Sequence, residues 1–247
     1  MRRPPDGKRR ANPRAAYCDT SGTVYEMPGL EPAFRVGRRF VRDPVALVAA
    51  PTREAARRAL KAFTVEYEPL PPVLTWEEAE GEEPLCTLLL EQGDPDRGFA
   101  EAAQIVEGVY HCGHQEHIYI ECQGMLAWFE PGGSVEVMGS MQCPFYVHHA
   151  LAHALGLPED KVRVRPSVIG GGFGGKEDYP SLIAIHAALL ARASRRPVKM
   201  VYDRHEDILA TTKRHPGRVR LRTGVAGDGR LIAMEIEVDL DGGAFRT

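Results

Sequence analysis

The chain has 247 residues, 43% of them hydrophobic, which is enough to bury one sizeable core or two modest ones. Its formal net charge is −3 and its isoelectric point is about 6.3, so we expect neither a nucleic acid nor an anionic membrane surface as a partner. No apolar run reaches the roughly 20 residues that span a bilayer, and the basic N-terminus lacks the apolar segment of a signal peptide.

The cysteines indicate a reducing compartment. There are five of them, an odd number, and no two are spaced as Cys-x-x-Cys. A disulfide framework and an iron–sulfur cluster within this chain are therefore not expected. We expect the protein to be cytoplasmic.

The first hundred residues divide into three parts by composition. Residues 1–33 are basic and rich in proline without periodicity, and we expect them to form a disordered arm. Residues 34–74 predict a strand over 40–50, a helix capped by Thr52, and a strand over 64–68 that prolines stop. Residues 75–100 mix acidic residues with glycine and proline, which is typical of a solvated linker.

From residue 101 onward, strand and helix patterns alternate. Strands are expected over residues 103–110, 118–120, 125–129, 135–138, 162–169, 197–202, 218–222 and 231–239. Helices are expected over residues 145–155 and 180–194, with a short third helix that starts at Asp203. The last two strands form a hairpin at Gly227-Asp228-Gly229. These patterns predict an α+β fold with mixed and antiparallel sheets and packed helices.

Two histidine clusters raise the question of a metal site. His149 and His153 share a helix face, but a zinc-protease helix carries glutamate after the first histidine, and Ala150 stands there. The other cluster consists of His111, Cys112, His114 and His117. It lies on an extended segment where alternate residues face opposite ways. We therefore expect hydrogen-bonded histidines rather than a zinc site, and we keep a zinc-binding module as an alternative.

A glycine-rich run at residues 169–177 is the strongest candidate for a ligand site. Five glycines surround Phe173, and Lys176 and Glu177 close the run. Ordering so many glycines costs more entropy than a plain turn requires, which favours a ligand loop. A phosphate-binding P-loop is excluded because Glu177 stands where serine or threonine should meet magnesium.

A dinucleotide site stays open as a second interpretation of this run. The spacing Gly170-x-Gly172-x-x-Gly175 fits the NAD or FAD fingerprint, with a strand before it and a helix and strand after it. However, Pro180 suits the first turn of the helix, so the helix begins several residues after the glycines. The helix dipole would then point away from a phosphate bound at the glycines.

Several motifs together resemble the xanthine dehydrogenase/aldehyde oxidase family of molybdenum hydroxylases. The run at residues 170–177 is similar to that family's molybdopterin-binding loop. Further similar segments, in family order, are residues 115–121, 140–142, 196–199, 203–207, 214–216 and 241–245. Residues 34–74 resemble the C-terminal part of the family's hammerhead domain. Residues 101–247 resemble its first molybdopterin-binding domain, incomplete at the C-terminus.

The resemblance implies roles for individual residues. Gln142 would hydrogen-bond a molybdenum oxo group, and Glu177 would orient the substrate. Further cofactor contacts would come from Gly171, Gly172, Phe173 and Gly174. No protein side chain would bind molybdenum, because the pterin dithiolene holds it.

The resemblance also implies an incomplete catalytic machinery. The family's general-base glutamate would lie beyond Thr247, so we expect the isolated chain to be inactive. Its partners would be the remainder of the molybdenum subunit, and 2Fe-2S and FAD domains or subunits. The substrate would be a purine-like heterocycle or an aldehyde, oxidised at a C–H bond with oxygen from water.

Overall fold

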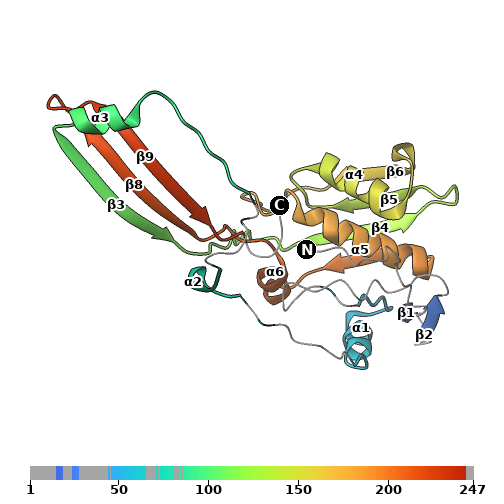
Figure 1. Cartoon of the computed structure of the whole chain (residues 1–247). Coiled ribbons are helices and arrows are strands. Elements are labelled where there is room, and N and C mark those ends of the chain that lie inside the picture. The colour runs from blue at the N-terminus through green and yellow to red at the C-terminus, as the bar shows by residue number, and fades with distance from the viewer. Residues whose placement is uncertain are drawn as a thin grey trace, which may run out of the picture. The chain divides into compact units, whose positions relative to one another are not determined.

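The computed structural model describes residues 15–18, 24–27, 44, 46–64, 71, 73–79, 84 and 86–242. Its elements are shown in Figure 1. The chain divides into two compact units, the first comprising residues 1–67 and 117–212 and the second residues 68–116 and 213–247. No described helix is long and apolar enough to cross a membrane.

The first unit is built on a four-stranded mixed sheet. Its strands, in spatial order, are β6 (Val162–Pro166), β5 (Val135–Gly139), β4 (Gly124–Phe129) and β7 (Val198–Val201). β5 and β6 pair in parallel, while β4 pairs antiparallel with both β5 and β7. A parallel pair requires a crossover, and α4 provides it between these two strands.

Two helices pack against this sheet and form the core with it, α4 (Pro144–Leu155) and α5 (Tyr179–Ser194). They cover the same face of the sheet in Figure 1. The core joins Ala127 and Val137 of the sheet to Leu151 and Ile183 of the helices, all fully buried. α5 is rich in alanine, and its buried Ala187 and other small side chains allow close approach to β4.

The helix ends follow local signals in the sequence. α4 starts with proline and ends at Gly156, whose φ of 64° is the left-handed conformation that glycine tolerates best. It leads to the short 3-10 helix η1 (Glu159–Lys161). α6 (Arg204–Ala210) begins with a capping box between Asp203 and Glu206.

The second unit contains a three-stranded antiparallel sheet in the order β3 (Gln104–Cys112), β8 (Gly217–Val225) and β9 (Leu231–Leu240). The helix α3 (Pro95–Glu101) packs on β8 and β9 through its buried Phe99. A Cβ on Gly98 would approach the Ile232 carbonyl oxygen to 2.7 Å, so glycine is required there. The Arg222 guanidinium lies 4.3 Å from the centre of the Phe99 ring.

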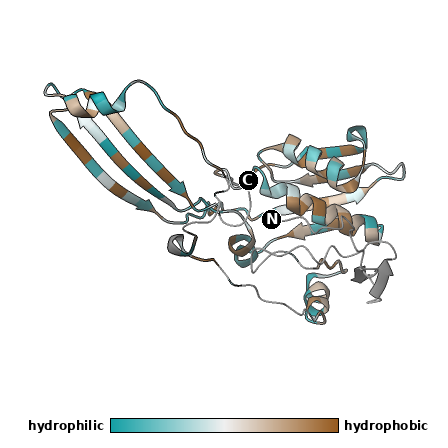
Figure 2. Ribbon diagram, in the orientation of Figure 1, coloured by the Kyte–Doolittle hydropathy of each residue, from teal (hydrophilic) through white to brown (hydrophobic). Residues whose placement is uncertain are grey.

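The two faces of this second sheet differ in chemistry. Along β9, Met234, Ile236, Val238 and Leu240 share one face with Val106 and Tyr110 of β3, and these side chains are 48–60% exposed. The opposite face carries a ladder of ion pairs: Arg218–Asp239, Arg220–Glu237 and Arg222–Glu107. The alternation of apolar and polar residues along these strands is visible in Figure 2. We call the face that carries Met234, Ile236, Val238 and Leu240 the apolar sheet face.

Most elements expected from the sequence are confirmed. The α+β class with mixed and antiparallel sheets is correct, as are the two long helices and the final hairpin. Thr52 caps α1 (Arg53–Leu60) by accepting a hydrogen bond from the Ala55 N–H. Residues 65–68 of the strand expected over 64–68, and the start of the strand expected over 40–50, lie outside the described residues.

Three strand predictions need correction. Residues 46–50 and 118–120 are not strands, and β6 ends at Pro166 instead of residue 169. At residues 118–120 the carbonyls of Tyr119 and Ile120 accept hydrogen bonds from the Arg204 guanidinium, which replaces a partner strand. Beyond Pro166 only the Ser167 N–H continues the ladder, to the Gly139 carbonyl.

Other elements fall inside ranges expected to be irregular. β1 (Ala15–Cys18) and β2 (Val24–Met27) pair antiparallel within residues 1–33. The short helix α2 (Trp76–Ala79) and α3 lie within residues 75–100. The division of the chain into four domains stays a prediction.

Candidate functional site

The glycine run forms a tight loop between β6 and α5. Gly171 and Gly174 have φ of 98° and 90°, and Phe173 has φ of 52°, which is uncommon for a residue with a side chain. The Gly175 N–H donates to the Gly172 carbonyl at 2.8 Å and closes the turn. Asp178 precedes the first residue of α5, so the helix starts after the loop and not within it.

Gln142, which lies between β5 and α4, holds this loop in place through hydrogen bonds to its backbone. Its side-chain Oε1 accepts hydrogen bonds from the backbone N–H groups of Gly174 and Lys176, both at 3.1 Å. Its own backbone N–H donates to the Lys176 carbonyl at 2.6 Å. The side-chain Nε2 has no hydrogen-bond acceptor in the described part of the chain. Gln142 is exposed, so this amide group offers two free N–H donors at the surface of the loop.

A buried lysine paired with a partly exposed glutamate anchors the loop. The Lys176 ammonium is fully buried and lies 2.8 Å from Glu121 Oε2 and 3.0 Å from Ser140 Oγ. It also lies 4.8 Å from the centre of the Tyr119 ring, a cation–π contact. A buried charge is tolerated only when it is paired in this way.

The carboxylate of Glu121 collects three donors. Besides Lys176, the Ser140 hydroxyl and the Gly170 N–H each donate to Oε2 at 2.7 Å. Desolvation acts to raise the pKa of Glu121, but the hydrogen bonds from Lys176, Gly170 and Ser140 outweigh it and lower the pKa below its ordinary value. Glu121 therefore stays ionised at neutral pH and keeps Lys176 paired.

The positions of the five glycines follow from these contacts. A Cβ on Gly172 would collide with the Gln142 side chain, and a Cβ on Gly170 would come within 2.5 Å of Glu121 Cβ. A Cβ on Gly175 would come within 2.6 Å of the Tyr119 ring. Gly171 and Gly174 are instead required by their positive φ. Each glycine thus serves close packing or a left-handed backbone.

The outer side of the loop is open. Phe173 is 76% exposed, and Gly174 and Glu177 are also exposed. Within the described residues, the backbone N–H groups of Gly171, Gly172 and Phe173 make no hydrogen bond, and the Glu177 carboxylate has no partner. The exposed groups at the loop are therefore the Gln142 amide, an aromatic ring and a carboxylate.

A second group of side chains behind the loop was not expected from the sequence. The buried Gln123 donates through Nε2 to the Gly175 carbonyl at 2.7 Å and to the Tyr119 hydroxyl at 2.8 Å. The Gln123 N–H donates to the buried Asp207 carboxylate at 2.6 Å. Burial and the neighbouring Asp207 raise the pKa of Tyr119, so its hydroxyl stays protonated. Only the polar character of Gln123 among apolar neighbours could have indicated this role.

The geometry does not favour the dinucleotide interpretation. In a dinucleotide-binding unit the helix joins adjacent parallel strands, and the glycines lead directly into the helix. Here β6 and β7 lie at opposite edges of the sheet. Three residues, Lys176 to Asp178, separate the last glycine from α5.

The histidines of the two clusters lie in different parts of the chain. His111 and Cys112 are exposed in β3 of the second unit, and His149 and His153 are both exposed on α4 of the first. His117, also in the first unit, lies beside the loop, where a Cβ on Gly174 would be 3.8 Å from its Nε2.

One surface pocket lies away from the loop. It encloses about 300 Å³ and is lined by Trp128, Phe129 and the C-terminal end of α5. The glycine loop precedes the N-terminal end of that helix. We place the candidate site at the loop, because the unpaired donors gather there.

Comparison with known proteins identifies relatives of this chain. The family model of the molybdopterin cofactor-binding domain matches residues 79–247. The large molybdopterin subunit of nicotinate dehydrogenase from Eubacterium barkeri is 37% identical over 214 residues, which is 83% of this chain and 50% of that subunit. Xanthine dehydrogenase from Oryza sativa subsp. japonica is 36% identical over 205 residues, which is 81% of this chain and 15% of that protein.

Solved structures have the same fold. Quinoline 2-oxidoreductase from Pseudomonas putida 86 superposes with a TM-score of 0.65 at 29% identity, over 76% of this chain and 25% of that one. Aldehyde oxidoreductase from Desulfovibrio gigas superposes with a TM-score of 0.66 at 25% identity, over 76% of this chain and 22% of that one. The chain therefore spans half or less of the length of each of these relatives.

The ion pair between Lys176 and Glu121 leads to a prediction about stability. Glu121→Gln should lower the free energy of unfolding by about 1–3 kcal/mol at pH 7, because it leaves the buried Lys176 ammonium without its counter-charge. Glu177→Gln, in the same loop but exposed and unpaired, is the matched control and should change the free energy by less than about 0.5 kcal/mol. Urea denaturation of the full chain measures both.

The same pair predicts how the effect depends on pH. Since the pKa of Glu121 is lowered on folding, its stabilising contribution is complete above the ordinary glutamate pKa of about 4.3 and disappears as the pH falls through the lowered value. The stability difference between wild type and Glu121→Gln should therefore shrink in acid. A difference that stays constant down to about pH 3 would contradict the pairing.

Proposed function

This chain belongs to the family of molybdopterin cofactor-binding domains, and we propose that its glycine loop and Gln142 form one side of a molybdopterin site in a molybdenum-containing oxidoreductase. The observation that carries this proposal is the arrangement of Gln142. The loop occupies its Oε1, so its Nε2 is fixed as a neutral donor at the loop surface. A neutral donor suits an oxo group on a metal centre that already carries its own ligands.

The residues of this chain fit such a cofactor. Gly171, Gly172 and Phe173 offer unpaired N–H groups, and Gly174 has no Cβ to hinder close approach. The Phe173 ring would pack against the cofactor and would shield it from water. When bound, the cofactor supplies redox chemistry at molybdenum, which the pterin dithiolene holds without a protein ligand. The chain binds, orients and shields it.

Glu177 would face the substrate. Its carboxylate is exposed, as the Phe173 ring of the same loop is, and it has no partner among the described residues. An ionised carboxylate accepts hydrogen bonds, so it would orient a substrate that carries N–H donors. A purine-like heterocycle offers such donors and an aldehyde does not, which favours the heterocycle.

Other chains or chain segments would complete the enzyme. The general-base glutamate would come from the remainder of the molybdenum subunit, and 2Fe-2S and FAD domains or subunits would carry the electrons. The apolar sheet face supports such a partner, because half-exposed apolar side chains in a contiguous row are typical of an interface.

The proposal predicts where the cofactor is found. A complex purified from the cytoplasmic fraction through a tag on this chain should contain about one molybdenum and one pterin per chain, whereas the chain alone should contain neither and show no turnover. Gly172→Ala should lower the cofactor content of the complex at least about tenfold, because its methyl group displaces Gln142.

Gly132→Ala is the matched control for that substitution. Gly132 lies in the turn between β4 and β5, where a Cβ meets open space. Its complex should keep the wild-type molybdenum and pterin content. A complex that is free of molybdenum, or equal content in Gly172→Ala and wild type, would refute the assignment of the loop.

A separate prediction concerns the substrate. Glu177→Gln should leave the molybdenum content of the complex unchanged and lower kcat/KM for an N-heterocyclic substrate about 10- to 100-fold, through loss of a charge-assisted hydrogen bond. Oxidation of an aldehyde, which lacks the N–H donor, should change much less. Equal losses for both substrates would remove Glu177 from the role of orienting the heterocycle.

The apolar sheet face predicts the behaviour of a surface variant. Ile236→Asp should change the stability of the isolated chain by less than about 1 kcal/mol, because Ile236 is half-exposed. It should reduce the amount of partner chain that co-purifies, since a charge would be buried on association. Glu237→Ala, on the opposite face, should leave co-purification unchanged. Quantitative mass spectrometry of the tagged complexes distinguishes these outcomes.

A further inference from the structure

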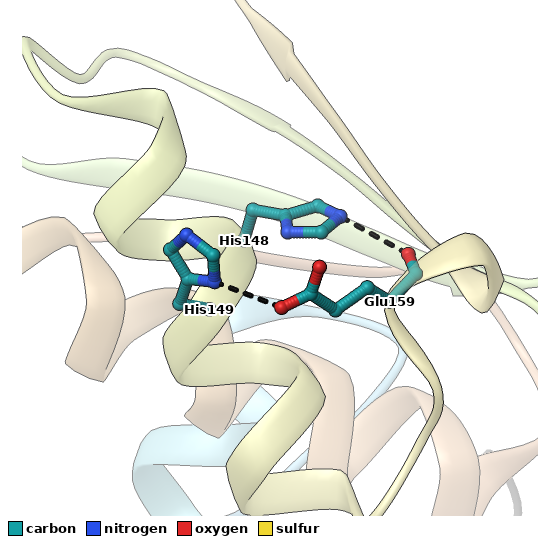
Figure 3. Close-up of side chains that lie close together, drawn as sticks. All are labelled: His148, His149 and Glu159. Atoms are coloured by element: carbon teal, nitrogen blue, oxygen red, sulfur yellow. Dashed lines mark hydrogen bonds and ion pairs between the residues drawn. The ribbon is translucent and has the colours of Figure 1, made fainter.

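Three side chains with metal-binding chemistry gather at the outer side of α4. They are His148 and His149 of the helix and Glu159 at the start of η1, and one potential ligand atom from each lies within 4.8 Å of the other two. Figure 3 shows both imidazole rings extending from the helix toward Glu159. This grouping is separate from Gln142 and the glycine loop.

The connection after α4 brings these residues together. Neighbouring residues on a helix point about 100° apart, so two adjacent histidines do not normally share a ligand. Here Gly156 ends the helix, and the Leu157 N–H donates back to the Ala152 carbonyl at 3.0 Å, which turns the chain. η1 then contacts α4, so Glu159 lies opposite the second turn of the helix.

The backbone and the side chain of Glu159 engage one ring each. His148 Nε2 lies 3.1 Å from the Glu159 carbonyl oxygen, and His149 Nδ1 lies 3.1 Å from Glu159 Oε1. A carbonyl oxygen only accepts, so Nε2 of His148 must carry the proton in this contact. In the neutral ring Nδ1 is then left with a lone pair that can bind a metal ion. Histidines that bind metals are oriented by such a hydrogen bond from the other ring nitrogen.

We propose that His148, His149 and Glu159 bind one divalent transition-metal ion, with zinc as the best match. Two imidazoles and one carboxylate, with a water in the fourth position, are an established tetrahedral ligand set for zinc. Imidazole nitrogens disfavour magnesium and calcium, which prefer oxygen ligands. The site neither needs molybdopterin nor depends on the function proposed above.

The ligands can close around an ion at little cost. Bonds of about 2.0–2.1 Å in a tetrahedron place ligand atoms about 3.4 Å apart, so the 4.8 Å spread has to contract. The His149 and Glu159 side chains are 63% and 66% exposed, which leaves both free to rotate. A bound ion would cross-link α4 to η1 and the start of β6.

Calorimetric titration of the metal-free, tag-free full chain with zinc chloride tests the proposal. Wild type should bind one ion per chain, and His149→Ala and Glu159→Gln should each weaken binding at least about tenfold. His153→Ala is the control, because this exposed histidine stands one turn further along the same helix. It should bind zinc as wild type does.

A second measurement separates a built site from loose adsorption. Zinc should raise the Tm of wild type and His153→Ala but not of Glu159→Gln. Without zinc the three Tm values should be similar, because His153 and Glu159 are both exposed. X-ray absorption should show nitrogen and oxygen ligands without sulfur. No binding, several weak ions per chain, or unchanged affinity in Glu159→Gln would overturn the proposal.

Discussion

The buried Lys176 ammonium constrains the whole region around the glycine loop. A lysine with no solvent exposure is stable only beside an anion, and Glu121 is that anion. The two residues belong to segments far apart in the sequence, and Ser140 at the end of β5 joins them. Lifting the loop would therefore leave a charge unpaired. This fixes the loop backbone even though glycine alone would leave it flexible.

The sequence predicts the secondary structure best where local patterns and burial agree. α5 combines small apolar residues with a proline in its first turn, and the β8–β9 hairpin combines alternation with a glycine turn. Residues 118–120 show the limit of such patterns. Their alternation is real, since Tyr119 is buried between two exposed isoleucines, but Arg204 takes the backbone hydrogen bonds that a strand would use. No local pattern reveals a partner 85 residues away.

The candidate site was predictable only in part, for a similar reason. The glycines and Gln142 stand out in the sequence and meet in the structure. Lys176 also stood out, but its burial against Glu121 depends on how three distant segments pack. The group of His148, His149 and Glu159 escaped notice because helical metal motifs use residues four apart, whereas this group uses adjacent residues and one from beyond the helix end.

Phe173 shows that the loop is not optimised for its own stability. Its left-handed backbone costs about 1–2 kcal/mol for a residue with a Cβ, and a glycine there would be free of that cost. Five neighbours in the run are already glycine, yet an aromatic ring stands at this position, largely in solvent. A screen that selects only for thermal stability would therefore favour Phe173→Gly. Such a screen would gradually erase the one exposed aromatic ring of the loop.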